Sequence, residues 1–236
     1  MNRYRLSEIL LAIFLFFGIT GSTYYFDGNA ALVLSFSSED PVRWESDIVR
    51  LESKTVPSEA ILFLGSSSIV RWDSLSSDMA PLAVINRGFG GAKMNDVVYY
   101  ADRLIEVDAP IAVVIFVGTN DIHPGASKEP RWLVEKYREL VELIRARISD
   151  IPIYYIGITP SIMRWDVWDI AQRTNELIED FSSSDPLLYF IDTSSNLLIN
   201  GKLNGRNYVP DGLHLSKNGY EIWASQIGGV LKRDLL

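Results

Sequence analysis

Short apolar runs that alternate with longer amphipathic stretches are the feature that most restricts the fold of this chain. The runs are Ala60–Gly65, Leu82–Gly88, Ile111–Gly118, Ile151–Ile158 and Leu187–Asp192. Each is almost continuously apolar, which is typical of strands that are buried on both faces of a parallel sheet. Repeated strand–helix units of this kind predict an α/β fold, a three-layer α/β/α sandwich around a five-stranded parallel sheet with right-handed crossovers.

Helical patterns lie between and around these strands. One covers Pro41–Ser53, with Asp40 placed to cap its start and a proline at its first position. A second covers Pro130–Asp150, and the last begins at about Lys217. Apolar residues recur at helical spacing along one face of each helix, which we expect to pack on the sheet. They are Trp44, Ile48 and Leu51 in the first, Leu133, Tyr137, Leu140 and Ile144 in the second, and Tyr220, Trp223, Ile227 and Leu231 in the last.

Composition excludes several classes of protein. The chain has 236 residues and a formal net charge of -8, without a basic patch, which argues against a nucleic-acid partner. It has no cysteine, so thiolate catalysis, disulfides and cysteine-ligated metal sites are excluded. Two histidines without cysteine do not make a zinc site, and no carboxylate spacing indicates calcium or magnesium. We therefore expect neither a metal nor an organic cofactor.

The N-terminal residues 1–26 depart from this globular composition. Arg3 and Arg5 precede an apolar run from Ile9 to Ile19, which is the layout of an export signal, but no A-x-A cleavage site follows. Read through to Phe26, the stretch is about the minimum length of a membrane span. It predicts a signal-anchor or signal peptide with its positive end in the cytoplasm, and a buried core helix is the alternative. The protein is then membrane-anchored or exported, on the periplasmic or extracellular side.

The length of the chain fits one large domain with an appendage. After the N-terminal segment, residues 27–56 are expected to form a linker and an amphipathic helix. Residues 57–236 are expected to form the globular domain, and no internal repeat or low-complexity tract interrupts them.

Polar or glycine-rich segments stand where the predicted strands end. Gly65–Ile69, Asn86–Asp96 and Gly118–His123 follow the first three strands, and Asp211–His214 precedes the last helix. In parallel α/β sheets, the working residues lie in the loops at the carboxyl ends of the strands. We therefore expect these four segments to meet at one edge of the sheet.

The residue types in these segments suit acyl transfer. A serine hydroxyl is a weak nucleophile and needs a base within hydrogen-bond reach, and His214 is the best candidate base. Asp211 precedes it by three residues, so its carboxylate can hold the imidazole in the required tautomer. The oxyanion of a tetrahedral intermediate needs donors. A serine backbone N–H, an N–H of the glycine-rich loop and the Asn120 amide are candidates.

These four segments, in this order, resemble the sequence blocks of the SGNH hydrolases, also called the GDSL esterase/lipase family. The resemblance extends from about Pro57 to Trp223 and implies a flavodoxin-like SGNH hydrolase fold for residues 57–236. Matched by position, it implies site residues of two kinds. They are the catalytic residues Ser67, Asp211 and His214, and the oxyanion-hole residues Ser67, Gly91 and Asn120.

One departure concerns the motif that names the family. Its Gly-Asp-Ser is here Gly65-Ser66-Ser67, so the support that the aspartate usually gives to the loop has to come from elsewhere. Ser67 is the nucleophile by register. Ser66 and Ser68 are then expected to be orienting or loop-capping hydroxyls. A phosphate-binding loop is the rival interpretation of Gly88–Lys93, but neither the G-x-G-x-x-G nor the G-K-[ST] spacing is present.

Three further residues are candidates for binding substrate. Arg164 and Trp165 lie in Thr159–Trp165, which follows the fourth strand, and they could shape an acyl or sugar pocket. Packing in the core or at the rim is the alternative for the tryptophan. His123 follows Asn120 closely and either lines the pocket or lies in solvent.

The sequence thus predicts a serine esterase that hydrolyses short acyl esters through an acyl-enzyme, without a cofactor. The resemblance implies small esters, acylated glycans or lysophospholipids as substrates. A cell-envelope O-acyltransferase with the same site is one alternative, which the N-terminal segment motivates. A non-catalytic glycan-binding module is the other, which the Gly-Ser-Ser departure motivates.

Overall fold

The computed structural model describes residues 23–26, 32–35, 39–106, 110–125 and 127–236. The chain divides into two units, Met1–Arg43 and Trp44–Leu236. In the first unit, β1 (Thr23–Phe26) pairs antiparallel with β2 (Leu32–Ser35). Most of the expected signal or anchor segment, residues 1–22, lies outside the described residues. Within the described ranges, no helix has both the length and the apolar character needed to cross a membrane.

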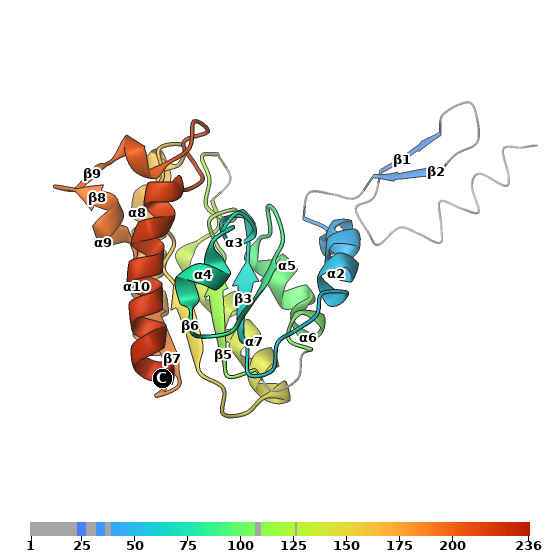
Figure 1. Ribbon diagram of the computed structural model, residues 1–236. Coiled ribbons are helices and arrows are strands. Elements are labelled where there is room, and N and C mark those ends of the chain that lie inside the picture. The colour runs from blue at the N-terminus through green and yellow to red at the C-terminus, as the bar shows by residue number, and fades with distance from the viewer. Residues whose placement is uncertain (1–22, 27–31, 36–38, 107–109, 126) are drawn as a thin grey trace, which may run out of the picture. The chain divides into compact units, whose positions relative to one another are not determined.

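The second unit is built on a parallel sheet of five strands in the order β4-β3-β5-β6-β7 (Figure 1). Their bounds are Ile61–Gly65 for β3, Val84–Gly88 for β4, Ala112–Phe116 for β5, Ile153–Ile156 for β6 and Leu188–Ile191 for β7. All five predicted strands are confirmed, and each predicted end lies within two residues of the observed one. In register, Gly65 of β3 lies between Gly88 of β4 and Phe116 of β5. The carboxyl ends of the three strands therefore reach the same edge.

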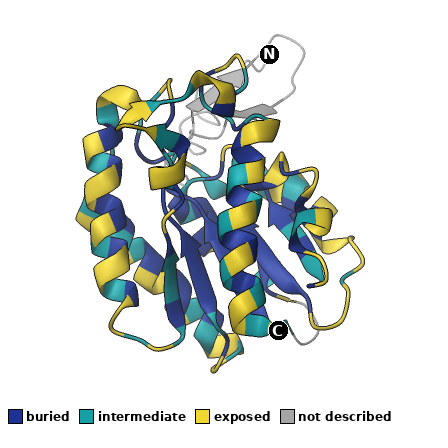
Figure 2. Ribbon diagram, turned by 60° about the vertical axis from the view of Figure 1, so that its left-hand side comes forward, coloured by how far each residue is buried: buried dark blue, intermediate teal, exposed yellow. Residues whose placement is uncertain are grey.

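Alternate residues of the strands contribute to two separate cores. Leu62 and Leu64 belong to the core under α2 (Glu45–Glu52), α5 (Met94–Tyr99), α6 (Ala101–Leu104), α7 (Pro130–Arg147) and α8 (Trp168–Ser182). Ile61 and Phe63 belong to the core under α3 (Ser67–Val70), α4 (Leu75–Met79), α9 (Ser194–Leu197) and α10 (Lys217–Leu235). Successive side chains of a strand point to opposite faces, so both faces of the sheet are covered. Figure 2 shows the buried strands between helices that expose their outer sides, as expected for a three-layer sandwich.

The predicted helices are present, with small differences at their ends. α7 begins with its proline as expected but ends at Arg147, after a last turn that carries Arg145 and Arg147, where cations are favourable. The first pattern starts as a 3-10 turn, η1 (Pro41–Trp44), before α2. Asp40 accepts a hydrogen bond from the Val42 N–H (3.0 Å), so it caps this turn rather than α2 itself.

α2 contacts the rest of the sheet unit along its whole length. Its apolar face buries Ile48 and Leu51 completely. Arg103 of α6 donates hydrogen bonds to the carboxylates of Glu45 and Glu52, and Arg87 of β4 donates to the Leu51 carbonyl. The sheet unit therefore includes α2, which the boundary expected at residue 57 leaves out.

The remaining elements are short and lie in the C-terminal third. They are η2 (Trp165–Val167), β8 (Leu198–Ile199), β9 (Lys202–Leu203) and η3 (Gly205–Asn207). β8 and β9 form a small antiparallel pair. The segment between η3 and α10 carries Asp211 and His214. An isolated antiparallel β-bridge joins Tyr208 and Leu215 near its two ends.

Candidate active site

The turn that follows β3 places Ser67 at the edge of the sheet. Gly65 has φ +142°, and a Cβ at this position would lie 2.0 Å from the carbonyl oxygen of Phe116, so only glycine fits. Ser66 is extended, and Ser67 is the first residue of α3. The chain thus reverses sharply at the end of a buried strand, which leaves the Ser67 side chain half-buried at the rim.

The structure brings Ser67, His214 and Asp211 together although 147 positions separate the serine from the histidine. Ser67 Oγ lies 2.8 Å from His214 Nε2, and His214 Nδ1 lies 2.7 Å from Asp211 Oδ2. With Nδ1–H donated to the carboxylate, Nε2 accepts the hydroxyl proton of the serine. We call these three residues the relay. An arrangement of this kind can activate a serine hydroxyl as a nucleophile.

Asp211 is held in its ionised form by local hydrogen bonds. Burial raises the pKa of its carboxyl, but the His214 backbone N–H, the His214 ring and the Leu213 N–H all donate to it and lower the pKa to about 2. The two backbone bonds reach Oδ1 at 2.8 Å and 2.9 Å, and they leave Oδ2 for the ring. The turn therefore fixes the carboxylate as the acceptor for Nδ1–H.

The support for the Gly65-Ser66-Ser67 turn comes from the neighbouring strands. Ser66 N–H donates to the Phe116 carbonyl (3.1 Å), and Phe89 N–H donates to the Gly65 carbonyl (3.0 Å). The Asn86 amide donates to the Ile69 carbonyl of α3 (2.5 Å). Ser66 stands at the N-cap of α3 but, among the described residues, makes no side-chain capping hydrogen bond there, so an orienting or loop-capping role of its hydroxyl stays a prediction.

The loop after β4 carries Gly91, which has φ +76°, a conformation that favours glycine. A Cβ on Gly91 would lie 3.3 Å from the ring of Trp44, so the side chain of this last residue of η1 packs directly against the loop. The Trp44 indole N–H donates to Asp96 Oδ2 (3.1 Å) just after the loop. Trp44, which sequence analysis treated only as a helix-face residue, thus contributes to the shape of the Gly91 loop.

Asn120 follows β5 and is anchored on two sides. Its Nδ2 donates to the carbonyl of Ala92, the residue after Gly91 (3.0 Å), and its Oδ1 accepts from Arg164 Nη2 (3.2 Å). The next residue, Asp121, is buried and accepts from the N–H of Met94 at the start of α5 (2.9 Å). These bonds connect the loops after β4 and β5.

Hydrogen bonds join the segments at this edge into a closed ring, which we call the rim ring. The bonds run from Phe89 N to Gly65 O (3.0 Å), Asn120 Nδ2 to Ala92 O (3.0 Å), Arg164 Nη2 to Asn120 Oδ1 (3.2 Å), Met163 N to Gly212 O (2.9 Å) and Ser67 Oγ to His214 Nε2 (2.8 Å). All four predicted segments take part. The segment after β6, which contains Met163 and Arg164, is the fifth member.

The three residues expected to bind substrate differ in their surroundings. The Arg164 guanidinium is directed at the loop after β5, where it also donates to the carbonyls of Thr119 and Ile122. Burial lowers its pKa, and the charge of Asp121 opposes that change. Trp165 is 39% exposed. His123 is partly exposed, and its Nδ1 lies 3.2 Å from the carbonyl of Pro124.

Arg71 is a rim residue that sequence analysis did not single out. It follows Ser67 by one helical turn, and its Nη1 lies 3.5 Å from Asp211 Oδ2 on the solvent side of the relay. Both side chains are substantially exposed, so solvent screens the attraction. Its position four residues after Ser67 could have indicated that Arg71 lies near the serine. Nothing in the neighbouring sequence indicates its contact with a carboxylate 140 positions away.

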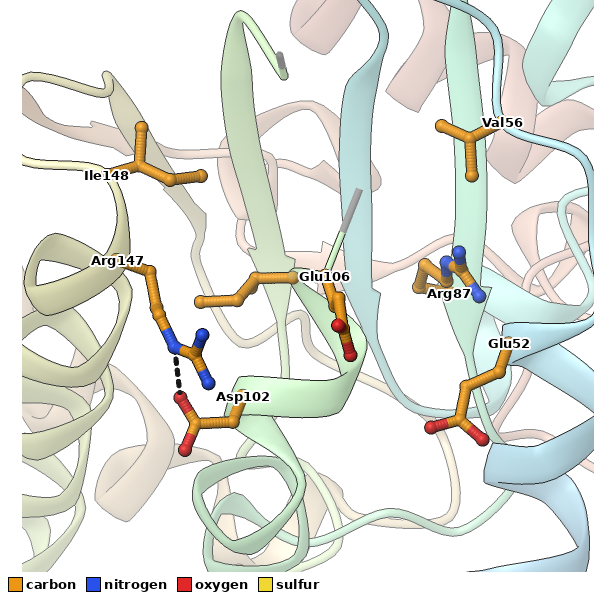
Figure 3. A pocket seen from close by; sticks show the side chains of 8 residues that line it. Glu52, Val56, Arg87, Asp102, Glu106, Arg147 and Ile148 are labelled. Atoms are coloured by element: carbon orange, nitrogen blue, oxygen red, sulfur yellow. Dashed lines mark hydrogen bonds and ion pairs between the residues drawn. The ribbon is translucent and has the colours of Figure 1, made fainter. Parts of the chain in front are cut away.

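Two cavities differ in how near they lie to the relay in the fold. A cavity of about 720 Å³ between α4 and α10 is lined by Arg71, Val209 and Leu215, among others, and so flanks the relay. Another, of about 490 Å³, is lined by residues of α2, β4, α6 and the end of α7, and by residues that follow α2, α6 and α7. In Figure 3, Arg147 pairs with Asp102 on one side of it, and Arg87 and Glu52 lie on the other. No residue of the relay lines it.

The described residues contain no cluster of three or more histidine, aspartate or glutamate side chains suited to hold a metal ion. The chemical groups at the rim include a hydroxyl, an imidazole, a carboxylate, backbone and amide N–H donors, and the guanidinium groups of Arg71 and Arg164. Such a set can bind and polarise a carbonyl group and attack its carbon.

Comparison with known proteins gives one family match. Residues 58–222 match the model of the GDSL-like Lipase/Acylhydrolase family. Among curated proteins, the N-acylneuraminate cytidylyltransferase of Escherichia coli is 27% identical over 180 residues, which are 73% of this chain and 40% of that protein. The chain therefore spans about two fifths of that relative. The platelet-activating factor acetylhydrolase IB subunit alpha1 of Bos taurus is 25% identical over 168 residues, 68% of this chain and 69% of that protein.

Among solved structures, a GDSL-like lipase of Bacteroides thetaiotaomicron superposes with a TM-score of 0.63 at 20% identity. The superposition covers 83% of this chain and 98% of that chain. At this level of identity the likeness concerns the fold. It agrees with the five-stranded parallel sheet and its two helical layers.

Proposed function

The chain belongs to the GDSL-like lipase/acylhydrolase family and is a carboxylic ester hydrolase, and on this premise we propose that Ser67 is its nucleophile. The observation that carries the proposal is the relay: Ser67 Oγ to His214 Nε2 at 2.8 Å and His214 Nδ1 to Asp211 Oδ2 at 2.7 Å. His214 takes the hydroxyl proton as Ser67 attacks the ester carbonyl. The same imidazole then gives the proton to the leaving alcohol.

The negative charge that develops on the carbonyl oxygen needs hydrogen-bond donors. We assign this role to the backbone N–H of Ser67, the backbone N–H of Gly91 and the side-chain amide of Asn120. The rim ring supports this assignment. In it, the Asn120 amide is hydrogen-bonded to Ala92, the residue after Gly91, and Ser67 is hydrogen-bonded to His214. Water then hydrolyses the acyl-enzyme, with His214 as the base that activates it.

The substrate that we propose is an ester of a short acyl group, with a sugar or a lysophospholipid as the alcohol. The bovine relative is named an acetylhydrolase, which favours a small acyl group. A site that fits an acetyl group discriminates against each further methylene by about tenfold or more. We expect kcat/KM for p-nitrophenyl acetate to exceed that for the butyrate, and that for the octanoate to be lower still. Faster turnover of the octanoate would reject a short-acyl site.

The same assay separates hydrolysis from the alternative of acyl transfer to a glycan. With p-nitrophenyl acetate and an excess of chitooligosaccharide, hydrolysis predicts free acetate as the main product. Acetylated sugar as the main product would make the protein an O-acyltransferase. The Ser67→Ala variant in parallel shows how much of either product depends on the relay.

We propose that the protein is exported or anchored to a membrane by its N-terminal segment. The support is the order of Arg3, Arg5 and the apolar run Ile9–Ile19 in the sequence. In the native cell, the full-length chain is expected in the membrane or outside the cytoplasm. Replacing both arginines by glutamate should reduce its export, because positive charge before the apolar run orients the segment. Recovery of the unaltered chain in the cytoplasmic fraction would contradict the proposal.

A further inference from the structure

The side chain of Arg164 is used for contacts within the protein. It comes from the turn after β6, yet its guanidinium reaches the loop after β5, more than 40 positions earlier. There it donates to the carbonyls of Thr119 and Ile122 and to Oδ1 of Asn120 (3.2 Å). Three acceptors from one short loop face Nη1 and Nη2, while Nε is buried without a hydrogen-bond partner in the part of the chain that the structure describes. The planar guanidinium can reach these acceptors together, whereas a lysine ammonium cannot reproduce this geometry.

These contacts determine which way the Asn120 amide faces. A guanidinium has only donors, so the atom of Asn120 that faces it has to be the oxygen. The Ala92 carbonyl has only an acceptor, so the atom that faces it has to be the nitrogen. If the amide were turned over, two donors would face each other at Arg164 and two acceptors at Ala92. Arg164 and Ala92 together therefore select one orientation of the amide.

We propose that Arg164 is a positioning residue that fixes the Asn120 amide for catalysis, an inference that rests on the proposed function. One hydrogen of Nδ2 is bonded to the Ala92 carbonyl. The orientation imposed by Arg164 directs the second hydrogen at the carbonyl oxygen of the substrate that Ser67 attacks. A donor of this kind stabilises the transition state most when it is already oriented before the reaction.

The turn that carries Arg164 also touches the other side of the relay. The N–H of Met163 donates to the carbonyl of Gly212 (2.9 Å), which lies between Asp211 and His214. Tyr208, just before that segment, donates through its hydroxyl to the carbonyl of Pro160 (2.8 Å). One turn after β6 thus holds both the oxyanion donor, through Arg164, and the segment of the base, through its backbone.

The test uses the full-length protein and p-nitrophenyl acetate. Arg164→Met removes the hydrogen-bond donors and keeps a long side chain. We expect kcat to fall about 10- to 100-fold, which does not exceed the fall in kcat when an oxyanion donor itself is removed. KM should change little if Arg164 acts only through its contacts with the loop after β5. Arg164→Lys keeps the positive charge but not the planar set of N–H donors, and we expect its kcat to fall nearly as far as that of Arg164→Met. Arg173→Met, an exposed arginine of α8, is the matched control and should leave kcat unchanged.

A double-mutant cycle with Asn120→Ala separates positioning from a general structural effect. Asn120→Ala alone is expected to lower kcat by about 10²- to 10³-fold. If Arg164 acts through Asn120, adding Arg164→Met to Asn120→Ala should cost less than about threefold more, because coupled residues are not additive. Additive losses, or a loss that appears only in KM, would overturn the inference.

Two further measurements separate a loss of the positioning role from misfolding and from a failure of the proposed function. Thermal unfolding of each variant shows whether it is folded, and if Arg164→Met fails to fold, the Arg164→Lys variant and its cycle with Asn120→Ala decide. Ser67→Ala is assayed in the same series. Activity that survives Ser67→Ala would overturn the proposed function, whereas Ser67-dependent activity that does not respond to either Arg164 variant would overturn the positioning role alone.

Discussion

Replacing Ser67 by alanine is expected to lower kcat for p-nitrophenyl acetate by about 10⁶-fold, the size of effect seen when a catalytic serine is removed from a relay of this type. The change deletes the one oxygen that lies 2.8 Å from His214 Nε2, and with it the atom that forms the acyl-enzyme. Initial rates with the purified full-length chain measure the loss. Circular dichroism and thermal unfolding should match the unaltered protein, because the side chain lies at the rim.

Three comparisons make this prediction specific. Ser68→Ala changes the adjacent hydroxyl and should retain most of the activity, which tests the register of the three serines. Ser67→Ala combined with His214→Ala should be no slower than Ser67→Ala alone, because the two residues act as a unit. A fluorophosphonate probe should label the unaltered chain at Ser67 and leave the Ser67→Ala variant unlabelled. Full turnover by Ser67→Ala would remove Ser67 from the mechanism.

Replacing Asp211 by asparagine is expected to lower kcat by about 10⁴-fold with little change in the fold. The carboxylate accepts Nδ1–H of His214 at 2.7 Å, which leaves Nε2 as the acceptor for the serine proton. An asparagine can present an N–H at the same place, and the ring then adopts the tautomer whose Nε2 carries a hydrogen. Asp180→Asn, an exposed position of α8, is the control and should be fully active. An Asp211→Asn variant with the kcat of the unaltered chain would contradict the relay.

The pKa of Asp211 adds a pH dependence to the same comparison. Its carboxyl has a pKa of about 2 in the folded protein against an ordinary value of 3.8, so the folded state binds its proton less readily. The stabilisation that this gives is fully present above about pH 4 and is lost as the pH falls towards 2. The Asp211→Asn variant lacks this pH-dependent stabilisation. The gap in melting temperature between the unaltered chain and the variant should therefore narrow between pH 4 and pH 2, and a gap that widens would contradict the assignment.

The central sheet could be predicted from the sequence because its strands are buried on both faces. Leu62, Phe63 and Leu64, for example, contribute to both cores, so the run is apolar without alternation. Glycine and polar residues after the apolar runs then indicated where the strands end. Gly65 has a backbone conformation and a close approach to Phe116 that exclude a side chain, and its position before three serines was visible in the sequence.

What the sequence could not provide is the set of contacts between distant segments. Arg164 was a candidate for binding substrate because it follows a strand, and nothing in the sequence indicated that its guanidinium donates to the loop after β5. Arg71 gave no local signal of its contact with Asp211. Trp44 was expected on the apolar face of the first helix, and it lies partly buried in η1, while its contact with the Gly91 loop depends on where α2 packs. Periodicity indicates which face of an element is buried, but not which neighbour covers it.

The packing of α2 has a practical consequence for shortened versions of the gene. A chain that starts at Pro57 would discard Ile48 and Leu51 from the interior and remove the partners of Arg103. It would also leave the loop of Gly91 without the indole ring against which it rests. Expression trials that aim to omit the N-terminal segment should therefore start the chain ahead of Trp44, because a later start removes the side chain that packs against the Gly91 loop.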